Sequence, residues 1–360
     1  MSGSTSYAER LLKLLGVAAR IPLTDAVYVD DATEWTDSGC ADLTGRADGL
    51  PLLAPDAVLP DTRLLSERAT IAGITRNGTT SVGGATRLIE CADGWVALSL
   101  ARDDDLASVP ALIEAPSADP WAAVEKWCRE HTATAAADRA QLLGMSAAAL
   151  AEPVVDAPFT LTPYESRRPP ADPPLVVDLS SLWAGPTCAR LLGLAGARVV
   201  KVESATRPDG ARNGPVEFWR RLHDGHESRV VDFRTPEGIA ELRDLLAEAD
   251  VVIEASRPRA MAQLGIVPHE LRPTCWVSIT AYGRSGPWSD RVGFGDDTAV
   301  AGGLVAWDGD TPLFVADAVA DPLAGLHAAV AAQACLVGSG THLIDVSLRD
   351  VASYVAGAGR

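Results

Sequence analysis

The turn at residues 180–188 has the position of a dinucleotide-binding loop but lacks its glycines. The turn joins an apolar run (PLVVDLS) to a helical run (TCARLLGLAG), and the next apolar run ends near Glu203. A pyrophosphate cradle needs G-x-G-x-x-G here, so that the backbone can approach the phosphates. Gly185 stands alone in this turn, and Gly193 and Gly196 fall at the far end of the helical run. The spacing therefore disfavours a nicotinamide or flavin enzyme.

Other short motifs of catalytic and metal sites are also missing. The sequence contains no GxxxxGK[ST] phosphate loop, no HExxH metal pair and no GxSxG nucleophile. Its cysteines are scattered, without a CxxC pair or a histidine at metal-ligand spacing. This pattern predicts reduced, mostly packed thiols and no metal site. The six cysteines are Cys40, Cys91, Cys128, Cys188, Cys275 and Cys335.

From Pro174 onward, apolar runs alternate with amphipathic helical runs. The helical segment 235–249 begins with Thr235 as an N-cap and Pro236 at its first position, and the buried run ADVVIEA follows it. The runs CWVSITAYG, DPLAGLHAAVAAQACLVG and THLIDVSLR continue the alternation as strand, helix and strand. The pattern predicts a Rossmann-like α/β domain over residues 174–360, with helices on both faces of a parallel sheet.

Residues 71–156 have a different pattern. Short apolar runs are separated by NG, GG and DG turn signals, and residues 120–152 are rich in helix formers, which predicts a smaller α+β domain. Prolines crowd residues 157–173, which we expect to be a linker. Residues 1–70 open with a short amphipathic helix (SYAERLLKLLGVAA) and then lack a period. We expect this N-terminal segment to pack on the large domain.

Charge and hydrophobicity disfavour two classes of partner. Forty-eight acidic residues against 31 basic ones give a formal charge of −17, which repels nucleic acid. The longest nearly uninterrupted apolar stretch, Ala328 to Val337, is about half the roughly 20 residues needed to span a membrane. The first residues (MSGSTSYAER) contain no basic segment followed by an apolar core, so we expect a cytoplasmic protein.

Five ordered segments between residues 176 and 350 resemble one known family. VVDLSSLWAGPTCARLLGLAGARVVKVES is similar to the opening of the class III CoA-transferases, the CaiB/BaiF family. The resemblance continues through RVVDFRTPEGIAELRDLLAEADVVIEASRPRAMAQLGI, SITAYGRSGPWSDRVGFGDD, VADPLAGLHAAV and THLIDVSLRD. The earlier stretch SVGGATRLIECADGWVALSL is similar to the small domain of that family. The resemblance implies an enzyme that moves CoA between an acyl-CoA and a free carboxylate.

The resemblance places the catalytic carboxylate at Asp321. In the family an aspartate attacks the CoA thioester to give a mixed anhydride, and an aspartyl-CoA thioester then passes CoA to the acceptor acid. Backbone oxyanion donors are implied at Gly83 and Gly84. By residue type alone, Asp321 before a proline and an Ala/Leu helix is also typical of an N-cap, and one residue can do both. Asp317 falls outside the matching position, and we expect it to be mainly solvated.

The resemblance also implies a set of CoA contacts. Trp183 lies in the turn that the family places against the cofactor, and Arg212 and Arg234 match basic CoA contacts. Ala255 and Ser256 stand where the family has Asn-Phe beside the adenine. Clustered arginines would let an acidic protein bind so anionic a molecule. The implied partners are an acyl-CoA, a carboxylic acid and a second copy of the chain in an interlocked homodimer.

Departures from the family pattern leave alternatives open. The basic Asn-Arg-Gly-Lys-Arg stretch is replaced by HDGHE at residues 223–227, and the small-domain match precedes the large domain, a rearranged order. A second hypothesis is therefore a catalytically silent subunit that binds acyl-CoA or an active paralogue. A third is an α-methylacyl-CoA racemase, which is disfavoured because Phe294 replaces the second acid/base histidine. We expect His327 to be packed.

Overall fold

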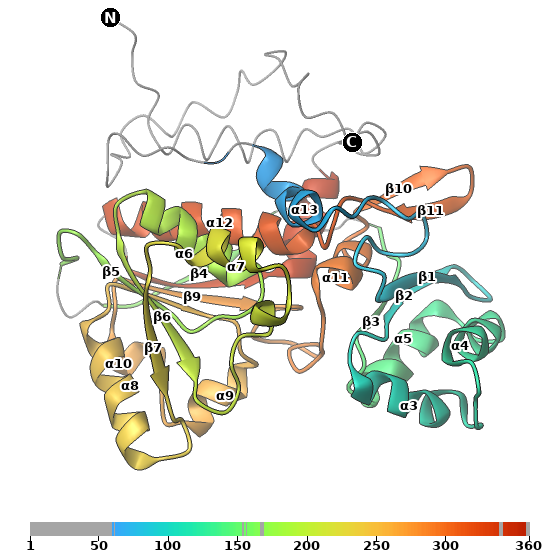
Figure 1. Cartoon of the computed structure of the whole chain (residues 1–360), viewed down its shortest axis with the longest axis horizontal. Helices are drawn as coiled ribbons and strands as arrows, with labels where there is room; N and C mark the ends of the chain where they lie inside the picture. The colour runs from blue at the N-terminus through green and yellow to red at the C-terminus, as the bar shows by residue number, and fades with distance from the viewer. Residues whose placement is uncertain are drawn as a thin grey trace, which may run out of the picture.

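The fold combines a large sheet covered by helices with a smaller sheet beside it (Figure 1). The computed structural model describes residues 60, 62–152, 155, 157–165, 169–337 and 341–357. The helix expected near the N-terminus and Cys40 lie outside these residues. Among the helices that are described, none combines the length and hydropathy needed to cross a lipid bilayer.

The large sheet has seven strands in the order β4-β12-β9-β8-β5-β6-β7. Every neighbouring pair is parallel except β12 with β4, which is antiparallel. This topology confirms the predicted α/β class with a parallel sheet. The strands are β4 (Thr160–Pro163), β5 (Leu175–Asp178), β6 (Arg198–Ser204), β7 (Glu227–Val231), β8 (Val251–Glu254), β9 (Cys275–Thr280) and β12 (His342–Ser347).

The segment 157–173, expected to be a linker, supplies the edge strand of this sheet. Leu161 of β4 lies opposite Ile344 of β12 in an antiparallel register. The side chains of β4 are exposed, and the strand is held by backbone pairing at one edge. The segment therefore connects the two sheets in sequence and also takes part in the larger one.

Helices cover both faces of the large sheet, because its strands direct alternate side chains to opposite faces (Figure 1). Val176 packs in the cluster formed with α6, α12 and α13, whereas Val177 packs in the cluster formed with α8. The helices of the first face are α6 (Ala184–Leu194), α12 (Ala320–Val337) and α13 (Leu348–Gly357), and those of the second are α8 (Pro236–Glu248), α9 (Pro258–Gln263) and α10 (Pro268–Leu271). The predicted N-cap of α8 is confirmed, since the Thr235 side chain accepts a hydrogen bond from the Gly238 N–H.

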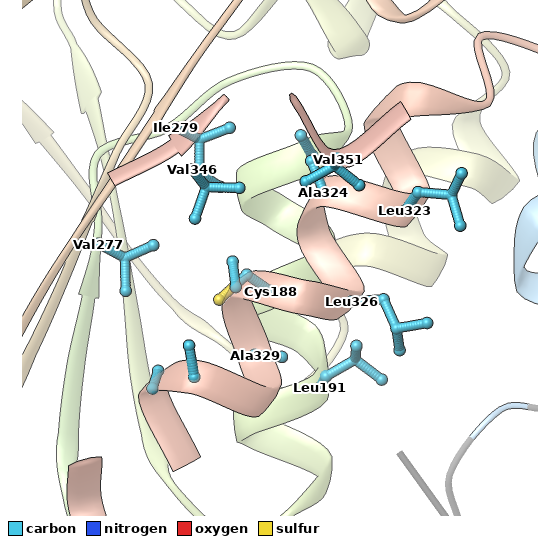
Figure 2. Packing of buried hydrophobic residues seen from close by; sticks show 14 of the residues in the cluster. Cys188, Leu191, Val277, Ile279, Leu323, Ala324, Leu326, Ala329, Val346 and Val351 are labelled. Carbon is cyan, nitrogen blue, oxygen red and sulfur yellow. The ribbon is translucent and has the colours of Figure 1, made fainter. Parts of the chain in front are cut away.

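Close packing of α6 against α12 fixes the start of α12. Figure 2 shows Cys188 and Leu191 of α6 beside Ala324 and Ala329 of α12. At Gly325 the helices approach so closely that an added Cβ would lie 2.4 Å from the Ala184 carbonyl oxygen. Small residues therefore allow near backbone contact, and α12 has little freedom to shift.

The smaller sheet has its own helices and its own hydrophobic cluster. The expected helical assignment of residues 120–152 is wrong in one part, because Ala147–Ala149 form strand β3 and not a helix. The preceding helix ends at Leu142, Gly144 follows with a φ of 75°, and the alanines then pair with β2. The elements are β1 (Thr86–Glu90), β2 (Trp95–Ser99), β3, α3 (Asp103–Ile113), α4 (Pro120–Arg129) and α5 (Ala133–Leu142).

Three short helices and a two-stranded hairpin lie between the two sheets or beside them and complete the frame of the site (Figure 1). Helix α2 (Glu67–Ala72) contacts α7 (Val216–His223), and α11 (Gly295–Ala301) contacts both α12 and β2. A hairpin of two strands follows α11 and contacts β1. The hairpin strands are β10 (Val305–Asp308) and β11 (Thr311–Phe314).

Candidate functional site

Four aspartates meet where α11 and α12 begin. Asp321 is the second residue of α12, Asp296 and Asp297 lie in the first turn of α11, and Asp317 lies in the loop before α12. Because α12 begins at Ala320, Asp321 occupies the first turn and not the N-cap position that its sequence context suggested. Asp296, Asp297 and Asp317 are close enough to Asp321 to raise its pKa.

A glycine allows α11 to approach the carboxylate of Asp321. A Cβ added at Gly295 would lie 2.6 Å from Asp321 Oδ2 and 2.3 Å from the carbonyl oxygen of Ala318. Both distances are far below van der Waals contact, so any larger residue would displace the loop or the carboxylate. The N–H of Asp321 also donates to the Ala318 carbonyl at 2.9 Å. The backbone around Asp321 is therefore held on two sides.

Burial raises the pKa of Asp321 from its ordinary value of 3.8 to about 7. The neighbouring carboxylates of Asp296, Asp297 and Asp317 act in the same direction, whereas Arg68 opposes them. Burial, and then Asp317, also raises the pKa of Asp296 to about 6. Asp321 and Asp296 still retain partial solvent exposure. A reachable carboxylate with a pKa near 7 is partly ionised at neutral pH and more basic than an ordinary aspartate, which favours it as a nucleophile.

Asp317 is buried and paired, which corrects the expectation that it is mainly solvated. Its side chain is 1% exposed, and its carboxylate accepts hydrogen bonds from Nε and Nη2 of Arg68, with an Nε–Oδ2 distance of 2.7 Å. The flanking residues Ala316 and Ala318 have φ angles of 51° and 43°. Such left-handed conformations cost alanine roughly 1–2 kcal/mol each, and here they turn the backbone around the buried carboxylate.

Trp183, expected to contact CoA, lies beside this ion pair. The Arg68 guanidinium carbon is 4.9 Å from the centre of the indole ring, within the range of a cation–π contact. The ring is 2% exposed and meets Phe218 of α7 edge to face at 5.2 Å. Its Nε1–H has no hydrogen-bond partner within the part of the chain that the structure describes. The structure thus connects the turn before α6 with the four aspartates.

The two glycines expected to supply oxyanion donors lie on a loop that reaches the same site. The buried Ser81 hydroxyl bonds to Asp296, and Arg68 Nη2 would lie 3.6 Å from a Cβ added at Gly83. The N–H of Gly84 donates to the Ser81 carbonyl at 2.8 Å, and Gly84 has a φ of 80°. Gly84 therefore closes the turn, and the N–H of Gly83 makes no backbone hydrogen bond among the described residues.

Ala255 and Ser256 lie at the carboxyl edge of the large sheet, where the strand order reverses. β5 is followed by β6 and β7 on one side, whereas β8 lies on its other side. Open α/β sheets bind ligands at this switch point. Ser256 donates to the buried Glu254 from both its N–H, at 2.9 Å, and its hydroxyl. The turn containing Trp183 follows β5 at the same edge, so the structure brings three of the expected CoA contacts to one place.

The two arginines expected to contact CoA are each paired with a carboxylate of the chain. Arg212, after β6, bonds to Glu203 with an Nε–Oε1 distance of 2.9 Å and lies 4.0 Å over the ring of Trp219. This bond to Arg212 is the main reason that the pKa of Glu203 falls to about 2. Arg234, after β7, is 69% exposed and bonds to Asp232 at 2.8 Å. Both follow strand ends at the carboxyl edge, but neither is a free cation.

A buried lysine that the sequence argument passed over holds the turn before α6. Lys201 Nζ lies 3.0 Å from Asp209 Oδ2 and 3.4 Å from Asp178 Oδ2, and it also donates to the Ser180 carbonyl. The side chain of Lys201 is 2% exposed. Asp209 in turn accepts a hydrogen bond from the Leu182 N–H at 2.9 Å. A lysine within the apolar run ARVVKVES was itself a signal, because a buried charge must be paired.

Burial lowers the pKa values of two histidines in the candidate region. The pKa of His223 is lowered to about 4, mainly by burial and then by Lys201, and the pKa of His226 is lowered by burial. His327 is 2% exposed and its Nδ1 lies 2.8 Å from the Leu323 carbonyl, which confirms that it is packed. Phe294, at the position of the racemase histidine, is the N-cap residue of α11.

Fold and site together define an α/β protein with a parallel sheet and a carboxylate of raised pKa in the first turn of α12. The family model "CoA-transferase family III" matches residues 174–358, half of the chain. The chain therefore belongs to CoA-transferase family III. The match contains Asp321 and the three other aspartates, whereas Arg68 and Gly83 lie outside it.

Several characterised relatives are similar to this chain. It is 32% identical to succinate–glutarate CoA-transferase of Agrobacterium fabrum over 220 residues, which are 54% of this chain and 55% of that protein. It is 33% identical to succinyl-CoA–D-citramalate CoA-transferase of Chloroflexus aurantiacus over 187 residues, which are 48% of this chain and 46% of that protein. The chain thus spans about half the length of the curated relatives it matches.

One solved structure that is similar to this chain is a CaiB/BaiF family protein from Brucella suis, which has 31% sequence identity to the chain and a TM-score of 0.47. The match covers 50% of this chain and 53% of that one.

Proposed function

We propose that this protein moves CoA between an acyl-CoA and a free carboxylate, with Asp321 as the nucleophile. The observation that carries the proposal is the raised pKa of Asp321, whose partly exposed carboxylate lies against Gly295 within the family match. The relatives named as CoA-transferases support the reaction class. The substrates are therefore an acyl-CoA and a carboxylic acid.

The first half of the proposed reaction loads the enzyme. An ionised Asp321 oxygen attacks the thioester carbonyl, the carbon–sulfur bond breaks, and CoA leaves as a thiolate from an aspartyl–acyl anhydride. The thiolate then attacks the aspartyl carbonyl, which releases the free acid and leaves an aspartyl-CoA thioester. The N–H of Gly83 is the proposed donor to the oxyanion that forms in these steps.

The second half transfers CoA to the acceptor. The acceptor carboxylate attacks the aspartyl-CoA thioester, which gives a second anhydride and CoA thiolate. Attack of the thiolate on the acceptor's carbonyl forms the new acyl-CoA and regenerates the Asp321 carboxylate. One oxygen of the acceptor thereby remains on Asp321, a consequence that can be measured.

We place CoA along the carboxyl edge of the sheet. Trp183, Ala255 and Ser256 meet at the switch point, and Arg212 and Arg234 lie on the loops after the neighbouring strands. We propose that Arg212 leaves Glu203 and Arg234 leaves Asp232 to bind phosphates of CoA, since phosphate is a strong competitor for arginine. We also propose that two copies of the chain form an interlocked homodimer and that the protein is cytoplasmic.

A second candidate, a catalytically silent subunit that binds acyl-CoA or an active paralogue, is favoured by one observation. Arg212 and Arg234 are committed to carboxylates, and His223 and His226 are uncharged where the family has basic residues. The chain therefore offers few free cations at the expected phosphate positions. A silent subunit would bind CoA or a partner without turnover.

CoA exchange distinguishes these candidates. Purified protein is mixed with a panel of acyl-CoA donors and isotope-labelled free carboxylates, and mass spectrometry follows label into acyl-CoA. We expect exchange with the wild type, none with Asp321→Asn, and normal exchange with Asp310→Asn, a variant of an exposed carboxylate in the β10–β11 turn. Exchange that persists in Asp321→Asn would refute the mechanism. Absence of exchange in the wild type, with CoA still bound, would favour the silent subunit.

A further inference from the structure

Arg68 is a cation beside three of the four aspartates, namely Asp296, Asp317 and Asp321. It acts on both Asp321 and Asp296, and it opposes the rise in their pKa values. It comes from α2 and thus from outside the residues that match the family model. An element that precedes the family region therefore contributes a charge to the site.

Three contacts fix the orientation of this guanidinium. Glu67, the neighbouring residue in α2, pairs with Arg190 of α6 at 2.6 Å, and both side chains are about one-tenth exposed. Nε and Nη2 of Arg68 donate to the buried Asp317, and the face of the guanidinium lies over Trp183. The group is thus held before any substrate binds, which reduces the entropy lost on binding.

One edge of the guanidinium remains available. Among the described residues, Arg68 Nη1 takes part in no hydrogen bond, while Nε and Nη2 bind Asp317. The side chain is 30% exposed, whereas Asp317 is only 1% exposed. A planar guanidinium can bind a protein carboxylate along one edge and a second anion at another, which a lysine cannot do with the same geometry.

The proposed reaction requires such a cation. The acceptor acid is an anion, and it must reach the Asp321 thioester next to the carboxylates of Asp296 and Asp317. When Asp321 carries an acyl or CoA group it is neutral, but the other two still repel an incoming carboxylate. Arg68 is placed to offset that repulsion.

We propose that Arg68 binds the carboxylate of the acceptor acid through its Nη1 edge and holds it beside Asp321, with Asp317 as its anchor. The inference rests on the transferase proposed above. By reversibility, Arg68 also binds the carboxylate of the acid that is released. Residues 62–72 are therefore part of the acceptor site and not only packing for the large sheet.

The test compares Arg68→Gln with a matched control, Arg87→Gln. Arg87 pairs with Glu125 at 2.8 Å, lies 4.3 Å over the ring of Trp121 and is 34% exposed, so it has the same kinds of contact with a carboxylate that is not one of the four aspartates. We expect Arg68→Gln to raise the KM for succinate by about 10–100-fold, as for loss of a charge-assisted hydrogen bond. The KM for acyl-CoA should change less than about threefold in either variant.

Two further variants separate binding from folding. Arg68→Gln leaves the buried Asp317 without its partner, so the double variant Arg68→Gln/Asp317→Asn tests the same loss without an isolated charge. Arg68→Lys keeps the charge but not the two-edged geometry, and we expect it to restore only part of the succinate affinity. Thermal unfolding of each variant checks that the fold is retained.

Direct binding separates failure of this inference from failure of the transferase proposal. Calorimetry with succinate and with acetate needs no turnover, and we expect binding by the wild type and Arg87→Gln but not by the double variant. Arg68-dependent binding without CoA exchange would support the acceptor site and refute the transferase. Three results would overturn the inference. The first is CoA exchange by the double variant with an unchanged KM for succinate, and the second is an equal change in the KM values for succinate and acyl-CoA. The third is a wild type that binds no carboxylate.

Discussion

Replacing Asp321 with asparagine should stabilise the protein at alkaline pH while abolishing CoA transfer. The reason is the raised pKa of this carboxylate, because a group that is harder to ionise in the folded state than in the unfolded state destabilises the fold when it is charged. Asparagine has nearly the same shape and carries no charge. The gain in stability should therefore grow as the pH rises from about 4 to about 7.

The size of the effect follows from the pKa. A rise from 3.8 to about 7 would correspond to about 4 kcal/mol if the whole shift were expressed in stability. Because Asp321 is partly exposed, solvent screening reduces this value, and we expect about 1–2 kcal/mol. The stabilising contribution of protonated Asp321 is complete below about pH 4 and is lost as the pH rises through about 7.

Urea unfolding of wild type and Asp321→Asn at about pH 5 and at about pH 8 measures this difference. We expect the variant to exceed the wild type in free energy of unfolding by a smaller amount at the lower pH than at the higher pH. Asp296 and Asp297, with pKa values raised to about 6 and about 7 chiefly by burial, titrate in both proteins. Asp310→Asn controls for the net charge. An equal difference at both pH values, or a less stable variant at the higher pH, would refute the reasoning.

Three other predictions concern Gly295, Lys201 and the pH dependence of the transfer rate. The variant Gly295→Ala should lose most of its transfer activity and about 1–3 kcal/mol of stability, since the added Cβ would clash with the backbone and with Asp321. The control Gly94→Ala, which has open space around its added Cβ, should show neither loss. Lys201→Met should lower the free energy of unfolding by about 3–5 kcal/mol, because two buried carboxylates lose their partner. The exposed control Lys126→Met should change it by less than about 0.5 kcal/mol, and equal effects would contradict this account. The transfer rate should rise with pH through about 7 as Asp321 ionises, and a rate that falls across that range would exclude an ionised nucleophile.

Local sequence patterns predicted most of the large sheet and its helices. Alternate burial of Val176 and Val177 follows from strand geometry, and the start of α8 follows from Thr235 and Pro236. These features depend on neighbouring residues only. Ala147–Ala149 were misassigned because alanine favours helix, whereas pairing with β2 and the break at Gly144 decided the outcome.

The electrostatics of the site could not be predicted in the same way. Asp317 is buried because Arg68, 249 residues away in sequence, is delivered to it by α2. No local pattern contains that pairing, and the composition around Asp317 suggests a solvated carboxylate. The raised pKa of Asp321 likewise depends on α11 packing against α12 through Gly295. The resemblance singled out Asp321, and tertiary contacts determine the environment of its carboxylate.

The most direct test of the central claim is transfer of heavy oxygen to Asp321. The protein is incubated with an acyl-CoA and an acceptor acid whose carboxylate carries heavy oxygen. The protein is then digested, and the mass of the peptide containing Asp321 is measured by mass spectrometry. If an aspartyl-CoA thioester is attacked by the acceptor, one heavy oxygen must appear in the Asp321 carboxylate. CoA transfer without heavy oxygen in that peptide would contradict the account.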